Sequence, residues 1–383
     1  MDDVVIVGAG PAGSVAATVL ARAGVRVRLL DRAAFPRDKL CGDTVNPGTL
    51  AALRRLGLST RIDDRGLRVD GMRVTGPRGI AIEGRYPDGV FGRALLRRDL
   101  DWALLQHAMD AGAQFEPSTA VRRAIVEESH GSPCVGGVVV GVNGRDRELR
   151  AHVTLAADGR RSTLAFGLGL ARHPARPRRW AIGAYYENAR GLSSLGEMHV
   201  RHGRYIGVAL VPGGLANVCL VKPFDEKRVR SPGPLFTTLL AAELAADPIL
   251  RERFADARLA QPPVVLGPLA IEVGAEQVRG LLLAGDAAGF IDPMTGDGLR
   301  FAVRGGALAA EAALESLARG WNGVHERLAK ARRREFASKW RFNRALRTLV
   351  ASPRGIEAAI IGTRLAPGLL RRIIATAGDC GTV

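Results

Sequence analysis

The chain begins with a short apolar run, a glycine-rich turn and a segment of helical spacing. Residues 4–7 are all apolar, the glycines follow at once, and a second strand-like stretch occupies residues 25–30. An unbroken apolar run of this length is typical of a buried strand in a parallel sheet. The pattern therefore predicts strand, turn, helix and strand, which together make one complete βαβ unit.

Helical and strand-like spacings alternate along the rest of the chain. Within residues 95–113, Leu100, Leu104 and Ala108 recur one helical turn apart. A long alanine-rich helix is expected to follow Asp297, which is placed to cap its first turn. Other helices are expected at 49–58 and after about residue 320, and strands at 67–74, 80–84, 135–142, 152–159, 180–222 and 280–290.

These elements predict an α/β fold with a Rossmann-like nucleotide-binding lobe, an inserted and largely antiparallel β domain for the substrate, and a helical C-terminal region. Strands alternating with helices favour the first lobe, and short strands without helices between them favour the second. We expect the nucleotide lobe at 1–66, 96–165 and 262–320, the substrate domain at 67–95 and 166–261, and the helical region at 321–383.

Composition and charge narrow the classes of function. The chain has 383 residues, of which 47% are hydrophobic, enough for a large core. Its 55 basic and 38 acidic residues leave a net charge of +17, which attracts anionic cofactors, lipid headgroups or nucleic acid. The basic residues are spread along the chain and only 5% of residues are aromatic, so we expect no stacking surface for nucleic acid.

Cysteine and histidine usage predicts no metal site. The cysteines are far apart, which argues against a disulfide scaffold or zinc site and fits a reducing cytoplasm. His199 and His202 are spaced awkwardly for one face of a strand, and no acid or further histidine is expected to join them. No basic leader and no run of about 18 apolar residues is present, so we expect neither a signal peptide nor a membrane span.

A glycine fingerprint lies between the first strand and the first helix. Gly8, Gly10 and Gly13 form GxGxxG, and Asp31 follows the second strand. The first glycine permits the tight turn, the second lets a pyrophosphate approach the backbone, and the third lets helix and strand pack closely. The positive helix end then faces the phosphates, and Asp31 would bind the ribose hydroxyls. This fingerprint leaves FAD and NAD open.

A second motif favours FAD. In LLLAGDAAGFIDPMTGDGLRFAV, a strand delivers Asp286 just past its carboxyl end, and Gly298 with Leu299 opens a helix. The chain is similar here to the geranylgeranyl reductase family and, more broadly, to the flavin hydroxylases of the p-hydroxybenzoate type. The resemblance implies that Asp286 binds the ribitol and pyrophosphate region, that Gly298 and Leu299 lie under the flavin ring, and that Pro293 lies close to the isoalloxazine.

Further stretches carry the same resemblance. VTLAADGRRST resembles the Asp-Gly motif of the hydroxylases and implies that Asp158 lies near the cofactor, although no basic residue follows Leu164, which leaves a role in nicotinamide use open. Arg97 matches the helix arginine that reaches the FAD phosphate, with Arg98 as an adjacent competitor. The resemblance also implies cofactor contacts at Ala12, Gly42 and Val121.

The loop RDKLCGD resembles the Lys-x-Cys-Gly stretch of the reductases, which implies that Cys41 and Gly42 lie beside the flavin. Cys41 is the one candidate for a catalytic side chain, and the alternative is that it is an inert, small packing residue. No other side chain is identified as a proton donor.

The resemblance points to an FAD-dependent oxidoreductase that acts on a hydrophobic isoprenoid, quinone or polyketide-like substrate, by C=C reduction or by hydroxylation. The reductases carry an aromatic Tyr-x-Trp-x-Phe-Pro stretch in the prenyl pocket, whereas GVALVP has Gly207, Ala209 and Val211 at those positions. Flavin halogenases need a Trp-x-Trp motif, and every tryptophan in this chain is isolated.

Two alternative functions stay open, and the electron donor is a separate question. An aromatic monooxygenase would use NAD(P)H and dioxygen on the same fold. We expect NAD(P)H or another donor to bind transiently, because no second glycine fingerprint follows a strand. A non-catalytic prenyl-binding protein could share the fold, but it would not need both sets of cofactor-binding motifs.

The basic tail suggests peripheral contact with a membrane from the cytoplasm. In residues 331–350, helical spacing gathers Phe336, Trp340, Leu346 and Val350 on one side and arginines on another. The apolar segment 356–374 is also flanked by arginines. The alternative is that the apolar sides pack on the nucleotide lobe and the arginines are merely solvated. The arginines are Arg334, Arg341 and Arg344 in the first segment and Arg364, Arg371 and Arg372 in the second.

Overall fold

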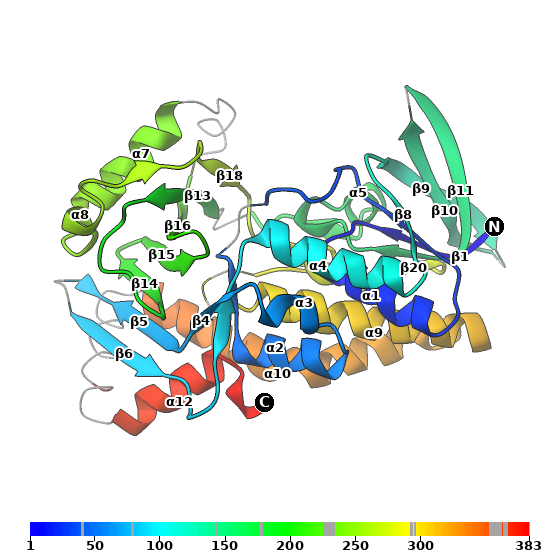
Figure 1. The fold of residues 1–383 in the computed structure, drawn as a ribbon. Helices are drawn as coiled ribbons and strands as arrows, with labels where there is room; N and C mark the ends of the chain where they lie inside the picture. The colour runs from blue at the N-terminus through cyan, green and yellow to red at the C-terminus, as the bar shows by residue number, and fades with distance from the viewer. Residues whose placement is uncertain are drawn as a thin grey trace.

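A computed structural model shows two lobes side by side, with long helices running beneath both (Figure 1). It describes residues 1–39, 42–77, 80–129, 131–142, 144–175, 179–224, 234–291, 294, 296–351, 362 and 367–382. The first lobe holds the N-terminal βαβ unit, and the second is built mainly of strands.

The first lobe is built on a sheet with a parallel centre. Strands β8 (Gln114–Glu116), β2 (Val27–Leu30), β1 (Asp2–Val7), β11 (Arg145–Ala156) and β20 (Leu281–Leu283) lie in this order and run parallel. Strands β10 (Ser132–Val142) and β9 (Ala120–Ser129) extend β11 as an antiparallel hairpin. Val4, Val5 and Ile6 of β1 are fully buried, because elements cover both faces of the sheet.

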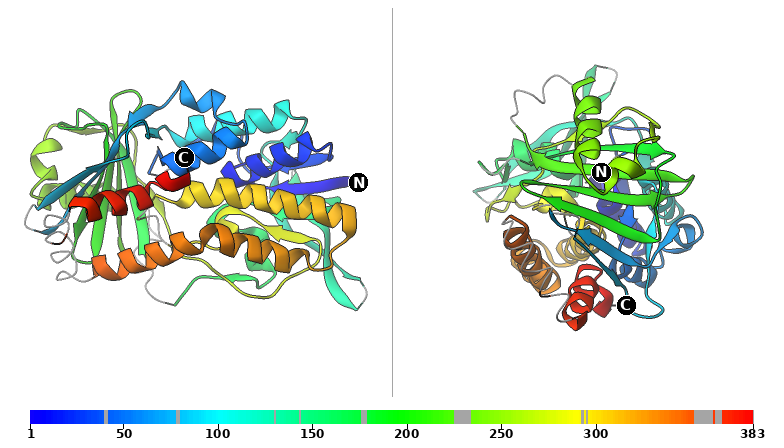
Figure 2. Two further views of the ribbon diagram at one scale, coloured as in Figure 1. Left: turned by 90° about the horizontal axis from the view of Figure 1, so that it is seen from below. Right: turned by 90° about the vertical axis from the view of Figure 1, so that its left-hand side faces the viewer.

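Helices pack closely against this sheet. Helix α1 (Pro11–Arg22) lies between α4 (Arg97–Asp110) and α9 (Gly298–Arg319), and α10 (Val324–Ala351) lies along the outside of α9 (Figure 2). The contact of α1 with α9 depends on Gly306, where a Cβ atom would lie 2.3 Å from the Ala12 carbonyl oxygen. The remaining helical segments of this lobe are α2 (Pro47–Arg55), α3 (Thr60–Asp63), η2 (Gly159–Arg161), α5 (Thr163–Gly167) and η3 (Gly285–Ala288).

The second lobe is a mixed, mostly antiparallel sheet. Its order is β17 (Arg258–Leu259), β13 (Arg179–Glu187), β16 (Leu215–Pro223), β15 (Arg204–Val211), β14 (Leu195–Arg201), β5 (Gly71–Thr75) and β6 (Ala81–Arg85), and β18 (Val264–Leu266) also pairs with β13. Only the β14–β5 pairing is parallel among the described strands of this sheet. The α/β fold with an inserted, largely antiparallel domain is therefore confirmed.

Alternation along the strands gives this sheet two different faces. Ile182 and Ala184 of β13 point to the outer face, where α7 (Pro234–Ala246) and α8 (Leu250–Arg253) cover them. Tyr185 points the opposite way, toward the first lobe, where its hydroxyl contacts Asp43. The smaller elements are β3 (Thr44–Val45), β7 (Gly92–Ala94) and β4 (Leu67–Val69), which form one sheet, the pair β12 (Ala171–Arg172) and β19 (Glu272–Val273), and the C-terminal α12 (Pro367–Ala377) and η5 (Cys380–Thr382).

The expected cap of the long helix is wrong. Asp297 does precede α9, but its side chain makes no capping hydrogen bond. Its Oδ1 atom instead lies 3.0 Å from Nζ of Lys339 in α10, and both side chains are buried. An ion pair between two helices has replaced the local cap, which leaves the amino end of α9 free to face a ligand.

The histidine expectation is also wrong in part, because an acid does join His199. Its Nε2 atom lies 2.9 Å from Oε2 of Glu197, and its Nδ1 atom lies 2.9 Å from Oγ1 of Thr75. Burial raises the pKa of Glu197, but hydrogen bonds from His199 and Arg253 outweigh it and hold the pKa at about 2. This network lies on the outer face of the second sheet, and His202 lies beyond it in an exposed turn. In the described part of the chain, no three potential metal ligands gather.

Candidate functional site

The glycine turn leaves the amino end of α1 open. Gly8 has φ +100°, and a Cβ atom there would lie 2.5 Å from the carbonyl oxygen of Ala157. At Gly13 a Cβ atom would lie 1.8 Å from the carbonyl oxygen of Gly8. Gly10 precedes the helix without a capping side chain, and Pro11 is its first residue. Strand β1 and helix α1 therefore approach as closely as backbones can, with uncapped N–H groups at the turn.

Asp31 lies against this turn, as its position after β2 predicts. Its Oδ2 atom accepts a hydrogen bond of 2.9 Å from the N–H of Ala9, and its Oδ1 atom accepts one of 2.9 Å from Ala33. The backbone thus holds the carboxylate beside the phosphate-binding turn, where a ribose would lie. Val121 is the second residue of β9 and follows Thr119 by two residues. The N–H of Thr119 bonds to the Asp31 carbonyl, so Val121 lies at the same end of the site.

The second motif lies next to the first. Gly285, at φ +60°, brings the η3 turn so close to α1 that its Cβ would lie 2.9 Å from Cβ of Ala12. Ala12 is buried between η3 and α9, and its side chain serves packing. Gly298 and Leu299 open α9 without a capping side chain. The uncapped ends of α1 and α9 therefore lie in one region, and both favour electron-rich groups.

Three basic residues from separate segments act on Asp286. Burial raises the pKa of this carboxyl, and the charges of Lys39, Arg97 and Arg160 oppose the shift. Burial lowers the pKa of Arg160 to about 10, and desolvation together with the charge of Arg97 lowers the pKa of Lys39. The site therefore carries concentrated positive charge beside the two helix ends.

Of the two candidate arginines in α4, the buried one is Arg97. Its guanidinium donates to both carboxylate oxygens of Asp101, at 2.8 and 2.9 Å, and Arg37 also contacts Asp101 at 3.1 Å. Arg98 is exposed, and its nearest acid is Asp38 at 3.8 Å. Because the charge of Arg97 acts on both Asp286 and Lys39, Arg97 is the arginine of the two that lies near the site.

Asp158 has a buried oxygen that the described protein does not satisfy. Its Oδ2 atom accepts a hydrogen bond of 2.7 Å from the N–H of Thr163, whereas Oδ1 is buried without a partner among the described atoms. Burial raises the pKa of this carboxyl. A ligand hydroxyl would satisfy Oδ1, since an unpaired buried oxygen is costly. Gly42 lies beside Asp43 at the junction of the lobes, and Cys41 and Pro293 lie outside the described residues.

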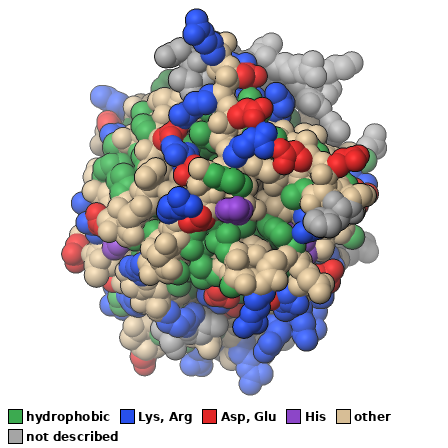
Figure 3. Space-filling view, turned by 90° about the vertical axis from the view of Figure 1, so that its right-hand side faces the viewer, with side chains coloured by type: hydrophobic (Ala, Val, Ile, Leu, Met, Phe, Trp, Pro, Cys, Tyr) green, Lys and Arg blue, Asp and Glu red, His purple; other side chains and the backbone are tan. Residues whose placement is uncertain are grey.

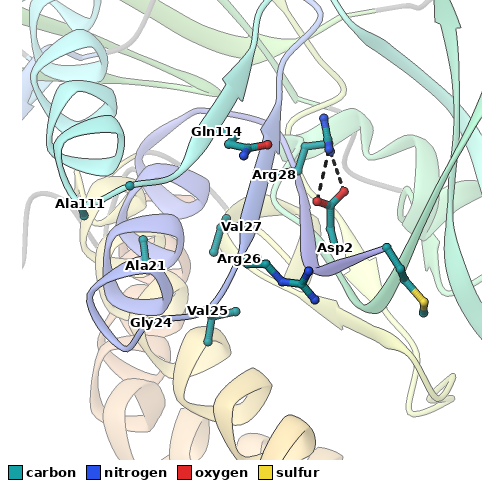
Figure 4. A pocket seen from close by; sticks show the side chains of 11 residues that line it. Asp2, Ala21, Gly24, Val25, Arg26, Val27, Arg28, Ala111 and Gln114 are labelled. Carbon is teal, nitrogen blue, oxygen red and sulfur yellow. Dashed lines mark hydrogen bonds and ion pairs between the residues drawn. The ribbon is translucent and has the colours of Figure 1, made fainter.

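A separate hollow lies at the opposite edge of the sheet (Figure 4). It is lined by the amino ends of β1 and β2, including Asp2, Arg26 and Arg28. These charges are already paired, Arg28 with Asp2 at 2.6 Å and Arg26 with Asp3 at 2.8 Å. Ligands of open α/β sheets bind at the carboxyl ends of the strands. The hollow at the amino ends is therefore not the candidate site.

The model of the FAD-binding-domain family matches residues 1–341. The chain belongs to this family. Its relatives include the menaquinone reductase of Mycolicibacterium smegmatis, which is 34% identical over 324 residues, covering 81% of this chain and 75% of the relative. The digeranylgeranylglycerophospholipid reductase of Methanosarcina mazei is 30% identical over 331 residues, covering 83% of this chain and 76% of the relative. This protein is an FAD-dependent oxidoreductase, as the motifs predicted.

Solved structures agree on the fold. A flavoprotein/dehydrogenase from Cytophaga hutchinsonii superimposes with a TM-score of 0.81 at 18% identity, covering 98% of this chain and 92% of the other. The flavin-dependent brominase Bmp2 superimposes with a TM-score of 0.82 at 20% identity, covering 99% and 94%. At these identities the likeness concerns the flavoprotein fold alone.

The arrangement fits FAD on grounds internal to this structure. Gly8 and Gly13 have no room for side chains, two uncapped helix ends face one region, and Asp158 presents an unsatisfied oxygen. A pyrophosphate, polar ring atoms and a sugar-like hydroxyl chain are the groups these features would bind. The individual contacts assigned from the sequence remain predictions.

Sequence reasoning missed Asp43, which joins the two lobes. The side chain of Asp43 is fully buried, and its backbone has φ +49°. Its Oδ2 atom accepts hydrogen bonds from Tyr185 at 2.5 Å and Asn217 at 2.7 Å, both in the second sheet. Its Oδ1 atom accepts a 3.2 Å bond from the N–H of Arg97 in the first lobe. The only available signal was an acid directly after the Cys-Gly pair of the RDKLCGD loop.

Asp43 makes stability depend on pH. Burial raises its pKa to about 7, although Tyr185, Arg97 and Asn217 oppose the shift. The folded protein therefore binds a proton that the unfolded chain, with an ordinary pKa of 3.8, releases as pH rises from about 4 to about 7. Between these two pH values the free energy of unfolding falls by up to about 4 kcal/mol. Above about pH 7 this contribution of Asp43 falls no further.

The Asp43→Asn variant removes this titration. We expect the free energy of unfolding of the variant, measured with denaturant, to rise relative to that of the wild type as pH increases from 4 to 8. The total increase in this difference should be at most about 4 kcal/mol. An Asp88→Asn variant, changed at an exposed loop position, serves as the control. A constant difference between Asp43→Asn and the wild type at all these pH values would contradict the assignment.

Proposed function

We propose that this flavoprotein reduces a carbon–carbon double bond in a hydrophobic isoprenoid or quinone-type lipid. The observation that carries the proposal is sequence identity over most of the chain. The relatives at 30 to 34% identity are named as reductases of menaquinone or of digeranylgeranylglycerophospholipid. The halogenases share the fold at only about 20% identity. The tryptophans Trp102, Trp180, Trp321 and Trp340 also form no Trp-x-Trp pair.

The inner face of the second sheet is a suitable place for such a substrate. Met198, Gly207 and Cys219 lie opposite one another on β14, β15 and β16 and are partly exposed, while most neighbouring positions on these strands are buried. Around Gly207, a Cβ atom would meet only the carbonyl oxygens of Cys219 and Glu197, at 3.9 Å. This apolar strip takes the place of the aromatic stretch that the reductases carry, so we propose that it admits a bulkier apolar group.

The protein contributes placement to the reaction. When bound, FAD supplies hydride transfer at its ring. The amino end of α1 would hold the pyrophosphate, Asp31 the ribose, and the amino end of α9 would lie toward the ring. We propose that NAD(P)H or another donor binds only transiently, because the sequence has no second glycine fingerprint after a strand.

Product analysis with and without oxygen tests the proposal. Protein supplied with a reductant and candidate isoprenoid lipids under anaerobic conditions should yield a product heavier by two hydrogen atoms. A product that forms only in air and gains one oxygen atom would identify a monooxygenase instead. A flavin-loaded protein that turns over none of these lipids under either condition would contradict the substrate class.

The Gly207→Phe variant tests the substrate strip. A ring at this position should cover the partly exposed row and lower turnover of the lipid by at least about tenfold, while FAD content stays at the wild-type level. His202→Phe, in the exposed turn that precedes the same strand, is the control, because it adds a ring outside the strip at a residue whose φ is not positive. Unchanged turnover in Gly207→Phe would remove this face from the substrate site.

A further inference from the structure

The two sides of the basic helix α10 have different surroundings in the structure. Phe336 and Trp340 pack into the core of the first lobe beside Phe301, and Leu346 packs against the cluster that includes Met294. The apolar side on which membrane insertion would depend is therefore covered for these three residues, and the side chain of Val350 lies outside the described part. Insertion of α10 into a bilayer through this side is excluded.

The opposite side of α10 carries an exposed basic stripe, which consists of Lys330, Arg333, Arg334, Arg341 and Arg344. At 3.6 residues per turn, these positions fall within about a third of the helix circumference and extend over about 21 Å. The intervening acid, Glu335, points inward to Arg300 and Arg304. Among the described residues, no ion pair joins any of the five stripe residues to an acid.

The stripe lies on the outside of the molecule. Helices α10 and α12 are neighbours on its lower side (Figure 2), and Nζ of Lys339 contacts the carbonyl oxygens of Thr376 and Ala377 at the end of α12. Arg371 and Arg372 of α12 are exposed as well. On the face in Figure 3, acidic and basic side chains mix over the centre, whereas basic ones gather at the lower edge, the side on which α10 lies.

We propose that the basic stripe of α10 binds the surface of an anionic lipid bilayer. Five uncompensated cations on a rigid helix form a straight line of charge that matches a plane of negative headgroups. Nucleic acid is the weaker match, because the aromatic residues of this helix face the core and leave no stacking partners beside the cations. In one respect the inference rests on the proposed function, since a lipid substrate would be held in that bilayer.

Binding in this mode is electrostatic and peripheral. In the described part of the chain, we find no helix with the length and apolarity that crossing a bilayer requires. Each basic side chain near an anionic surface strengthens binding by roughly fivefold. Removing four of the five should therefore lower the partition coefficient by at least about a hundredfold, and salt should weaken binding of the wild type.

Flotation with vesicles tests the proposal without substrate or turnover, so its failure is distinguishable from failure of the proposed function. Flavin-loaded protein is mixed at low salt with vesicles of phosphatidylcholine and phosphatidylglycerol, or of phosphatidylcholine alone. The test variant replaces Arg333, Arg334, Arg341 and Arg344 by Gln. The control variant loses the same charge at four exposed arginines elsewhere, Arg123, Arg145, Arg251 and Arg258.

We expect the wild type and the control variant to float with anionic vesicles only, and the stripe variant to stay behind with its FAD bound. Equal loss in both variants would assign the effect to net charge and overturn the proposal. Flotation with phosphatidylcholine alone, or of the stripe variant, would also overturn it. If the wild type retards a DNA duplex in a gel but does not float with anionic vesicles, the stripe is a nucleic-acid surface and the proposal is wrong.

Discussion

The Gly13→Ala variant is expected to lose FAD and much of its stability. The new Cβ atom would lie 1.8 Å from the Gly8 carbonyl oxygen and 3.0 Å from the Gly8 carbonyl carbon, so strand β1 and helix α1 must move apart. Overpacking of this kind costs about 1–3 kcal/mol or more. The same movement displaces the turn that would hold the pyrophosphate, so FAD affinity should fall at least about a hundredfold.

Titration of apoprotein with FAD and thermal unfolding measure the two effects separately. Gly167→Ala is the control, because Gly167 is exposed at the end of α5 and a Cβ there would meet no atom within 4 Å. This control should keep wild-type affinity and stability. If Gly13→Ala bound FAD as tightly as the wild type, the glycine turn would not be the pyrophosphate site.

Among the single variants of charged residues described here, Lys339→Met is expected to lose the most stability. Nζ of Lys339 lies 3.0 Å from Oδ1 of Asp297 and donates to the carbonyl oxygens of Thr376 and Ala377 at 2.6 and 3.0 Å. Both charged side chains of the pair are nearly fully buried. Removing the ammonium leaves a buried carboxylate without its cation, which costs about 3–5 kcal/mol.

Denaturant unfolding measures this loss, with Lys330→Met on the exposed side of the same helix as the control. The control should change the free energy of unfolding by less than about 0.5 kcal/mol. The double variant Lys339→Met with Asp297→Asn should recover part of the loss, because the unpaired charge is gone. A single variant as stable as the wild type would show that this pair does not hold α10 and α12 to α9.

The nucleotide-binding turn could be predicted because its causes are local. The apolar run of β1, the three glycines and the helical spacing of α1 are contiguous in sequence, and the structure shows the contacts that only glycine permits at Gly8 and Gly13. The fold class and the FAD cofactor are confirmed. The placement of Asp286 beside α9 follows from the same kind of strand–turn–helix pattern.

The charges around the site could not be predicted, because they converge from distant segments. Lys39, Arg97 and Arg160 all act on Asp286, and no spacing in the sequence relates them. Asp43 is similar, since its partners Tyr185 and Asn217 lie in the other lobe. The motifs marked the loops on which these side chains lie but carried no information about which ones would meet.

For helix α10, the sequence pattern predicted the two sides but not what covers them. Helical spacing correctly separated an apolar side, with Phe336 and Trp340, from a basic side. It could not decide whether protein or lipid covers the apolar side, because burial depends on the neighbouring helices. Asp297 was predicted wrongly for the same reason, because its side chain pairs with Lys339 of α10 and does not cap α9.

Measurement of FAD in the purified wild-type protein tests the central claim most directly. The account predicts a yellow protein with the absorption spectrum of an oxidised flavin, from which denaturation releases about one FAD per chain without a covalent link. A colourless protein that takes up no FAD from solution, although it is folded by circular dichroism, would contradict the account.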